Sequence, residues 1–117
     1  MDRNEFKART KKFALRVIHL VDALPRDVAA NTLGRQLIRS GTSVAANYRA
    51  AIRAKSRADF ISKMGTVEEE CDESLFWMEL LIESHRVKSE LLDSLIQEGS
   101  EILAITVASI KTARSRS

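Results

Sequence analysis

Hydrophobic residues recur every three or four positions through four long segments, and no segment shows the alternation that is typical of a β-strand. This spacing predicts four amphipathic helices, because residues three and four apart share one face of a helix. Steps of four and three alternate, as in a coiled-coil seam. The predicted seam of the first segment comprises Phe6, Thr10, Phe13, Val17, Leu20 and Leu24, and that of the third comprises Phe60, Met64, Val67, Cys71, Ser74, Met78 and Leu81.

The seams of the other two segments contain more small and polar residues. The second comprises Leu33, Leu37, Ser40, Val44, Asn47, Ala51 and Ala54, and the fourth comprises Leu92, Ile96, Gly99, Leu103, Thr106 and Ile110. We expect Ser40 and Asn47 to be structural polar residues of the core. Because a buried Asn requires hydrogen-bond partners, Asn47 is expected to bond across the bundle to Ser40, Ser74 or Gln36.

Short connections separate the four segments, at residues 25–27, around Ser56 and at residues 85–88. Pro25 ends the first segment. Ser56 and Asp59 form a capping-box-like pair, and Ser89 is the expected cap of the fourth segment. Because short connections place successive helices antiparallel, we predict an all-α fold, an antiparallel up-down-up-down four-helix bundle. Residues 1–113 would form this single domain, and residues 114–117 a disordered basic tail.

The sequence contains no recognisable catalytic or metal-binding motif. Neither His19 nor His85 follows a Glu by three residues, as the metal-binding helices of di-iron bundles require. The single cysteine, Cys71, has no Cys or His at metal-ligand spacing, excludes an internal disulfide and favours the cytoplasm. The longest uncharged run near the C-terminus, residues 102–110, is too short to span a bilayer. We therefore expect no enzymatic activity, no cofactor, no metal and no membrane partner.

Charge is divided unevenly along the chain. Residues 1–63 contain 14 Lys or Arg and 5 Asp or Glu, a net charge of +9, whereas residues 64–117 contain 5 and 11, a net charge of −6. Such a division indicates a nucleic-acid-binding face or an acidic face that meets the basic one. The simplest alternative is neutralisation within one folded bundle.

Two stripes lie two residues away from the seams, about 200° around their helices, and should therefore point away from the core. The basic stripe of the second segment spans about 27 Å and comprises Arg35, Arg39, Thr42, Ala46, Arg49 and Arg53. The acidic-aromatic stripe of the third segment comprises Glu69, Asp72, Phe76, Glu79 and Glu83, with Trp77 beside Phe76.

Three interpretations of these stripes remain open. In the first, the two stripes of neighbouring copies meet and close a ring, and the candidate oligomer interface comprises Arg35, Arg39, Thr42, Ala46, Glu69, Asp72, Phe76 and Trp77. In the second, basic residues contact nucleic acid, and the candidates are Lys7, Lys11, Lys12, Arg16, Arg49 and Arg53. In the third, the stripes are solvated and form weak surface pairs. The flat centre at Thr42 and Ala46 slightly favours a neighbouring helix.

One pattern of residues and spacing resembles a known family. Gln36-Leu37-x-Arg39-Ser40-x-x-Ser43-Val44-x-x-Asn47, followed by Phe60 and Gly65-Thr66-x-x-Glu69, is similar to the four-helix bundle family of bacterial 23S rRNA intervening-sequence proteins. That family often has Glu-Gly where this chain has Ala50 and Ala51. The resemblance implies a homopentameric, barrel-like assembly of basic bundles with no established enzymatic activity. In a related branch, the accessory proteins of diversity-generating retroelements associate with a reverse transcriptase and nucleic acid, so both become candidate partners.

The sequence thus predicts a non-enzymatic homo-oligomer, expected to be a pentamer, that binds RNA or DNA through basic surfaces. The alternative is a protein-only scaffold or adaptor that has no nucleic-acid role. A weaker third hypothesis is an RNA-processing enzyme whose site has no recognisable motif.

Overall fold

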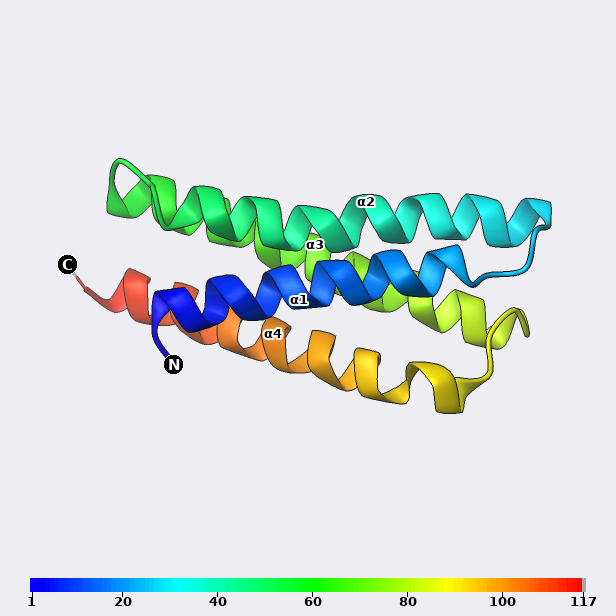
Figure 1. Ribbon diagram of the computed structural model, residues 1–117. Coiled ribbons are helices and arrows are strands. Elements are labelled where there is room, and N and C mark those ends of the chain that lie inside the picture. The colour runs from blue at the N-terminus through cyan, green and yellow to red at the C-terminus, as the bar shows by residue number, and fades with distance from the viewer. Residues whose placement is uncertain (117) are drawn as a thin grey trace.

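Four antiparallel helices form an elongated bundle of 49 × 21 × 20 Å (Figure 1). The computed structural model describes residues 1–116. Its helices are α1 (Arg3–Asp22), α2 (Val28–Ala51), α3 (Arg57–Glu83) and α4 (Ser89–Ser115), and no strand occurs within the described range. The predicted all-α, up-down-up-down architecture is therefore confirmed.

Side-chain caps begin the first three helices. Asp2, Asp27 and Ser56 each accept a hydrogen bond from the backbone N–H three residues further on, at 2.8, 2.9 and 3.0 Å. These bonds satisfy amide groups that have no partner within the helix. The carboxylate of Asp59 in turn accepts from the N–H of Lys55 at 3.1 Å. The expected cap at Ser56, with Asp59 as its partner, is confirmed.

The bounds of α4 differ from the prediction at both ends. Lys88 occupies the N-cap position and Ser89 is already helical, and no side chain caps this helix. Arg114 and Ser115, which we expected in a disordered tail, form the last residues of α4. The last residue of that predicted tail, Ser117, lies outside the described residues.

The predicted seams of α1 and α3 agree closely with the observed core. Their buried members are Phe6, Thr10, Phe13 and Val17 in α1, and Met64, Val67, Cys71, Ser74, Met78 and Leu81 in α3. The hydrophobic members belong to one continuous cluster along the bundle. Periodicity locates them well because each bulky residue at a three- or four-residue step marks the same helix face.

In α2 and α4 the buried face extends beyond the predicted seam. Each helix of a bundle packs against two neighbours, so its buried face is wider than a coiled-coil seam. The additional positions that become buried are Ala30, Gly34, Gly41 and Tyr48 in α2 and Leu95 and Ile102 in α4, whereas the seam members Leu33, Asn47, Ala54, Ile96 and Leu103 are only partly buried.

Two glycines mark close approaches between helices. A Cβ atom at Gly41 of α2 would lie 3.0 Å from both methyl groups of Val17 on α1. A Cβ atom at Gly99 of α4 would lie 3.0 Å from Cδ2 of Leu75 and 3.2 Å from Cε1 of Phe13. At both positions the absence of a side chain lets the neighbouring helix come nearer than any other residue would allow.

The two polar residues of α2 that we predicted for the core behave differently from each other. Ser40 is fully buried, and its hydroxyl is hydrogen-bonded at 2.8 Å to the hydroxyl of Ser74 on α3. Asn47 is only partly buried, and its amide donates to the backbone carbonyl of Ser43 at 2.9 Å. The predicted bond of Asn47 across the bundle is therefore wrong, because its side chain finds an acceptor one turn earlier in the same helix.

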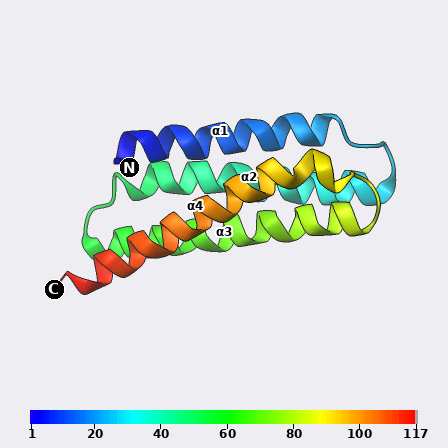
Figure 2. The same cartoon turned by 90° about the horizontal axis from the view of Figure 1, so that it is seen from below.

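The bundle is open at one end. α1 and α4 are joined along the first half of α4, where Arg9 binds Glu98 and Glu101, and Arg16 donates to Ser94. Beyond this contact α4 runs obliquely away from α1, so that the start of α1 and the end of α4 are separated (Figure 2). This divergence leaves a cavity at the end of the molecule that carries both chain ends.

Candidate nucleic-acid and subunit interfaces

The basic stripe lies on the solvent side of α2, as its offset from the seam predicts. Its four arginines and Ala46 are exposed, and Thr42 is partly buried with its hydroxyl donating to the carbonyl of Ile38 at 2.7 Å. Arg35, Arg49 and Arg53 form no ion pair with any described residue. Positive charge is therefore available at both ends of the stripe.

Arg39, in the middle of the stripe, is engaged within the chain. Its guanidinium pairs with Glu70 at 2.8 Å and also with Glu73, both on α3, and donates to Gln36 at 3.1 Å. Glu73 also accepts from the indole N–H of Trp77 at 3.2 Å. Arg39 is therefore already paired between α2 and α3 of one chain, and its assignment to an interface between copies stays a prediction.

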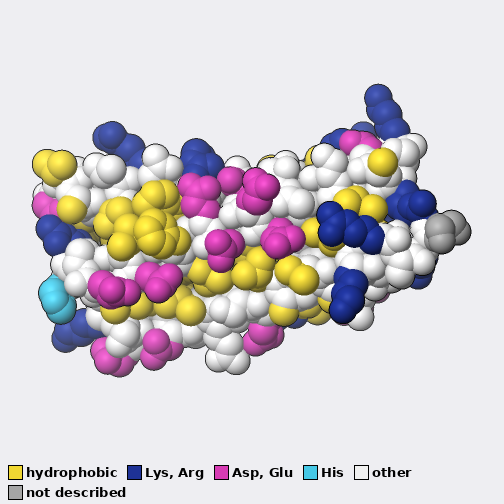
Figure 3. Space-filling model, turned by 180° about the vertical axis from the view of Figure 1, so that it is seen from behind, with side chains coloured by type: hydrophobic (Ala, Val, Ile, Leu, Met, Phe, Trp, Pro, Cys, Tyr) yellow, Lys and Arg dark blue, Asp and Glu magenta, His cyan; other side chains and the backbone are white. Residues whose placement is uncertain are grey.

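The acidic-aromatic stripe is exposed along α3. Phe76 is 48% exposed, and its ring centroid lies 5.2 Å from that of the partly buried Trp77. Glu69 and Asp72 are exposed on the same stripe. Figure 3 shows a hydrophobic patch bordered by acidic side chains on this face, with Lys and Arg toward both ends of the molecule. An exposed aromatic surface with a charged border is typical of a protein contact.

The basic residues of α1 divide into two groups. Lys7, Lys11 and Lys12 are exposed and form no ion pair within the described range, as expected for a surface that contacts phosphate. Arg16, which we also predicted to bind nucleic acid, is partly buried and donates to the hydroxyl of Ser94 at 3.0 Å.

Arg9 connects α1 to α4 through a bidentate pair. Its Nε and Nη2 atoms lie 2.7 and 2.8 Å from the two carboxylate oxygens of Glu98, and Nη2 is 2.6 Å from Glu101. The hydrogen bonds from Arg9 lower the pKa of Glu98, because they stabilise its ionised form. Part of the positive charge of the first half is thus neutralised inside the bundle.

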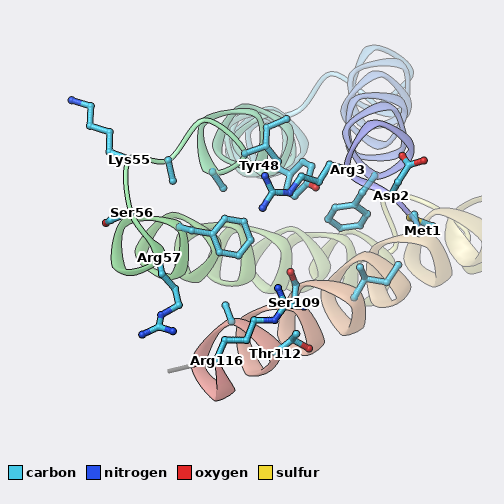
Figure 4. A pocket seen from close by; sticks show the side chains of 17 residues that line it. Met1, Asp2, Arg3, Tyr48, Lys55, Ser56, Arg57, Ser109, Thr112 and Arg116 are labelled. Atoms are coloured by element: carbon cyan, nitrogen blue, oxygen red, sulfur yellow. The ribbon is translucent and has the colours of Figure 1, made fainter.

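Sequence reasoning missed an end cleft of about 550 Å³ where α1 and α4 diverge (Figure 4). Aromatic rings line its interior, from Phe6 on α1, Tyr48 on α2 and Phe60 on α3. Its basic lining residues are Arg3, Lys55, Arg57 and Arg116. Because they come from segments far apart in the chain, the only sequence signal is that these basic residues lie near segment ends.

Two aromatic contacts shape the end cleft. The rings of Phe6 and Tyr48 meet edge to face with centroids 4.7 Å apart, and the guanidinium carbon of Arg3 lies 5.5 Å from the centroid of Phe60. Tyr48 is 5% exposed, and burial raises the pKa of its hydroxyl, which therefore carries its proton at neutral pH.

Two observations on the described residues concern metal binding and thiol reactivity. They contain no cluster of three or more His, Cys, Asp or Glu side chains placed to hold a metal ion. Burial raises the pKa of the Cys71 thiol to about 12, so this group is no nucleophile at neutral pH. Within residues 1–116, no helix combines the length and hydropathy that crossing a bilayer requires.

Comparison with known proteins identifies the family. The sequence model of the 23S rRNA-intervening sequence protein family matches residues 3–108, which include both stripes and nearly all of the four seams. The chain belongs to the 23S rRNA-intervening sequence protein family. The resemblance carried by the residues from Gln36 to Glu69 is thereby confirmed.

A solved structure agrees with this family assignment. It is the crystal structure of a protein with unknown function from the S23 ribosomal protein family of Bacteroides thetaiotaomicron VPI-5482, and it is 35% identical to this chain. The match covers 95% of this chain and 99% of that one, with a TM-score of 0.86. No curated protein matches this member of the 23S rRNA-intervening sequence protein family.

Proposed function

We propose that this chain forms a homo-oligomeric ring, expected to be a pentamer, that binds RNA or DNA through its exposed basic surfaces. The observation that carries the ring is the half-exposed Phe76 on an acidic face of α3, in a chain whose α2 presents a basic face. A second copy would cover the aromatic ring and neutralise both faces. The number five comes from the family resemblance.

The proposed subunit contact joins two different faces of the same bundle. A contact of this kind repeats from copy to copy and closes when the rotation is right, which yields a ring. Because Arg39 is already paired with Glu70 and Glu73, we assign the ionic part of the contact to Arg35. Phe76 would then pack against the flat part of α2 around Ala46.

Light scattering at micromolar concentration tests the ring. We expect the wild-type chain to be an oligomer and Phe76→Glu to be a monomer, because a buried carboxylate without a partner opposes the contact. Leu15→Glu is the matched control, since Leu15 is also 48% exposed but lies on α1, outside the proposed contact. A wild-type monomer, or equal effects of the two variants, would contradict the proposal.

The nucleic-acid role is supported by exposed basic residues on two neighbouring helices. Lys7, Lys11 and Lys12 on α1, Arg49 near the end of α2 and Arg53 just after it are exposed and free of ion pairs with described residues. Binding to phosphates by such groups releases counterions, so affinity should fall linearly with salt concentration on logarithmic axes. The family name refers to 23S rRNA, which makes a structured RNA the first probe.

A salt series of RNA binding, followed by fluorescence anisotropy, tests this role. Replacing both Arg49 and Arg53 with Gln should weaken binding and reduce the slope by about 0.9 for each phosphate that the variant no longer neutralises. An intact ring with weaker RNA binding assigns these arginines to phosphate, whereas a failure to assemble assigns them to the subunit interface. A flat salt response of the wild-type protein excludes a phosphate-binding surface.

The alternative function is a protein-only scaffold or adaptor. It is favoured by the engagement of Arg9, Arg16 and Arg39 within the chain, which reduces the charge available to nucleic acid. Ring assembly without RNA or DNA binding at low salt would support this alternative. No feature of the described residues points to a reverse transcriptase, so that partner is left out of the proposal.

A further inference from the structure

Basic side chains line the end cleft, with Arg3 beside Tyr48 inside it and Lys55 and Arg57 pointing outward from its rim (Figure 4). Arg3, Lys55, Arg57 and Arg116 line it, and none of them forms an ion pair with a described residue. The acidic residue in the lining is Asp2, whose carboxylate already accepts the N–H of Glu5 as the cap of α1. The cleft therefore attracts an anion, and its low-dielectric walls strengthen that attraction.

The interior of the end cleft is aromatic and holds an unused hydrogen-bonding group. The Tyr48 hydroxyl has no hydrogen-bond partner among the described residues, although the side chain is 5% exposed, and it is not among the fully enclosed polar atoms. It is therefore open to the cleft, where Figure 4 shows Tyr48 beside Arg3. A hydroxyl that faces a cleft and has no protein partner can bond to a bound molecule, so a ligand with a polar edge would fit this site.

We propose that the end cleft binds one unpaired nucleotide of a single-stranded RNA or DNA segment. The base would stack on the guanidinium of Arg3, which lies over Phe60, with its polar edge toward Tyr48, and the adjoining phosphate would bind at the basic rim. Bases stack on aromatic rings and on guanidinium groups regardless of sequence. This inference rests on the proposed nucleic-acid binding and locates the place where an unpaired base is bound.

Size and shape agree with this occupant. A volume of about 550 Å³ lies within the range of roughly 300–1,000 Å³ for pockets that hold small organic ligands. The bases of a duplex are paired and stacked inward, so a duplex can reach only the basic rim and not the aromatic interior. The end cleft should therefore discriminate single strands from duplexes, which the exposed lysines of α1 cannot do.

The test compares two fluorescent probes of about ten nucleotides, a single-stranded oligouridylate and a blunt-ended duplex, on the full chain. Ser109→Trp fills the cleft without changing the charge, since Ser109 is a partly buried lining residue of α4. Ser100→Trp is its control, because Ser100 is exposed on α4 outside the cleft. Arg3→Gln is matched by Arg26→Gln, since Arg26 is exposed in the connection at the opposite end of the bundle.

We expect Ser109→Trp and Arg3→Gln to weaken single-strand binding about tenfold and duplex binding much less. Both control variants should bind like the wild-type chain, and circular dichroism should show that all four variants are folded. Equal reductions for the two probes, or unchanged single-strand binding, overturn the cleft proposal while leaving the proposed function intact. A wild-type chain that binds neither probe at low salt overturns both.

Competition with small anions decides the chemistry of the site. Uridine monophosphate should displace the oligouridylate, and the NMR amide resonances of Phe60 and Ser109 should shift when it is added. Inorganic phosphate should compete only at much higher concentration, because it lacks the base. Displacement by dodecanoate but not by uridine monophosphate would instead identify a site for an anionic amphiphile and overturn the proposal.

Discussion

The contact between α2 and α3 and the contact between α1 and α4, called here the α2–α3 and α1–α4 seams, contain similar interactions but differ in how far they extend along the helices. Between α2 and α3, a buried hydroxyl pair of Ser40 and Ser74 lies inside, and Arg39 binds two glutamates outside. Between α1 and α4, Arg9 binds two glutamates as well, but the polar contacts involve only positions 94 to 101 of α4. The larger difference is in packing, because α2 and α3 contact each other far more extensively than α1 and α4 do.

The difference explains where the molecule can bind a ligand. A helix that is held in one region is free to diverge beyond it, and α4 does so toward its C-terminal end (Figure 2). The end cleft is the consequence of this divergence. The extensive contact between α2 and α3 instead holds the two stripes in a fixed relation to each other, as the proposed assembly requires.

A larger side chain at Gly99, where α4 packs closely against α1 and α3, should have the largest effect on stability. Gly99→Val would place methyl groups against Leu75 and Phe13, which already lie 3.0 and 3.2 Å from a Cβ at this position. We expect the free energy of unfolding to fall by about 2 kcal/mol, measured by urea denaturation.

Gly65→Val is the matched control for this substitution. No atom lies within 4 Å of a Cβ at Gly65, so the same change should leave stability unchanged or slightly increase it. Equal destabilisation of the two variants would show that helix propensity, and not the close approach of α4, is responsible.

Removing one charge from each seam compares the two arginines directly. Arg9→Gln should lower the free energy of unfolding by about 1–2 kcal/mol, because its bidentate pair with Glu98 is largely shielded from solvent. Arg39→Gln should cost less than about 1 kcal/mol, since Arg39 is 47% exposed and solvent screens its pairs. Thermal and urea unfolding measure both, and the opposite order would contradict our account of the α1–α4 seam.

The buried hydroxyl pair of the α2–α3 seam should contribute about 1 kcal/mol. Ser74→Ala removes its hydrogen bond to Ser40, while Ser40 keeps the carbonyl of Leu37 as an acceptor at 3.3 Å. Ser62→Ala, at an exposed position of the same helix, should change stability by less than about 0.5 kcal/mol. A double-mutant cycle with Ser40→Ala measures the coupling, and strictly additive effects would mean that the pair contributes nothing.

The smallest effect is a pH dependence specific to the α1–α4 seam. Arg9 lowers the pKa of Glu98 in the folded chain, so this group stabilises the fold at pH values above its ordinary pKa of 4.5. That contribution disappears as the pH falls through the lowered value and Glu98 becomes protonated. The stability difference between wild type and Arg9→Gln should therefore shrink in acid, and the difference for Arg26→Gln should not.

How far the sequence predicted each element depended on the size of its side chains. In α1 and α3, large hydrophobic residues mark the buried face, and periodicity located it correctly. In α2, Gly34 and Gly41 belong to the buried face, but a glycine contributes no hydrophobic signal to a pattern. The cap at Ser56 was predictable because its hydrogen bonds join neighbours in the chain, whereas the partner of Asn47 was not, since several acceptors lay within reach.

By itself, the sequence determined the four helices, their antiparallel order, the family, and the positions of both stripes, because all of these depend on spacing within one segment. The tertiary structure alone decided that Arg39 binds Glu70 and Glu73, and that Phe6, Tyr48 and Phe60 meet in one cleft. Those arrangements depend on the rotation and crossing angle of whole helices. Such angles result from packing between helices, and no single segment contains the information to specify them.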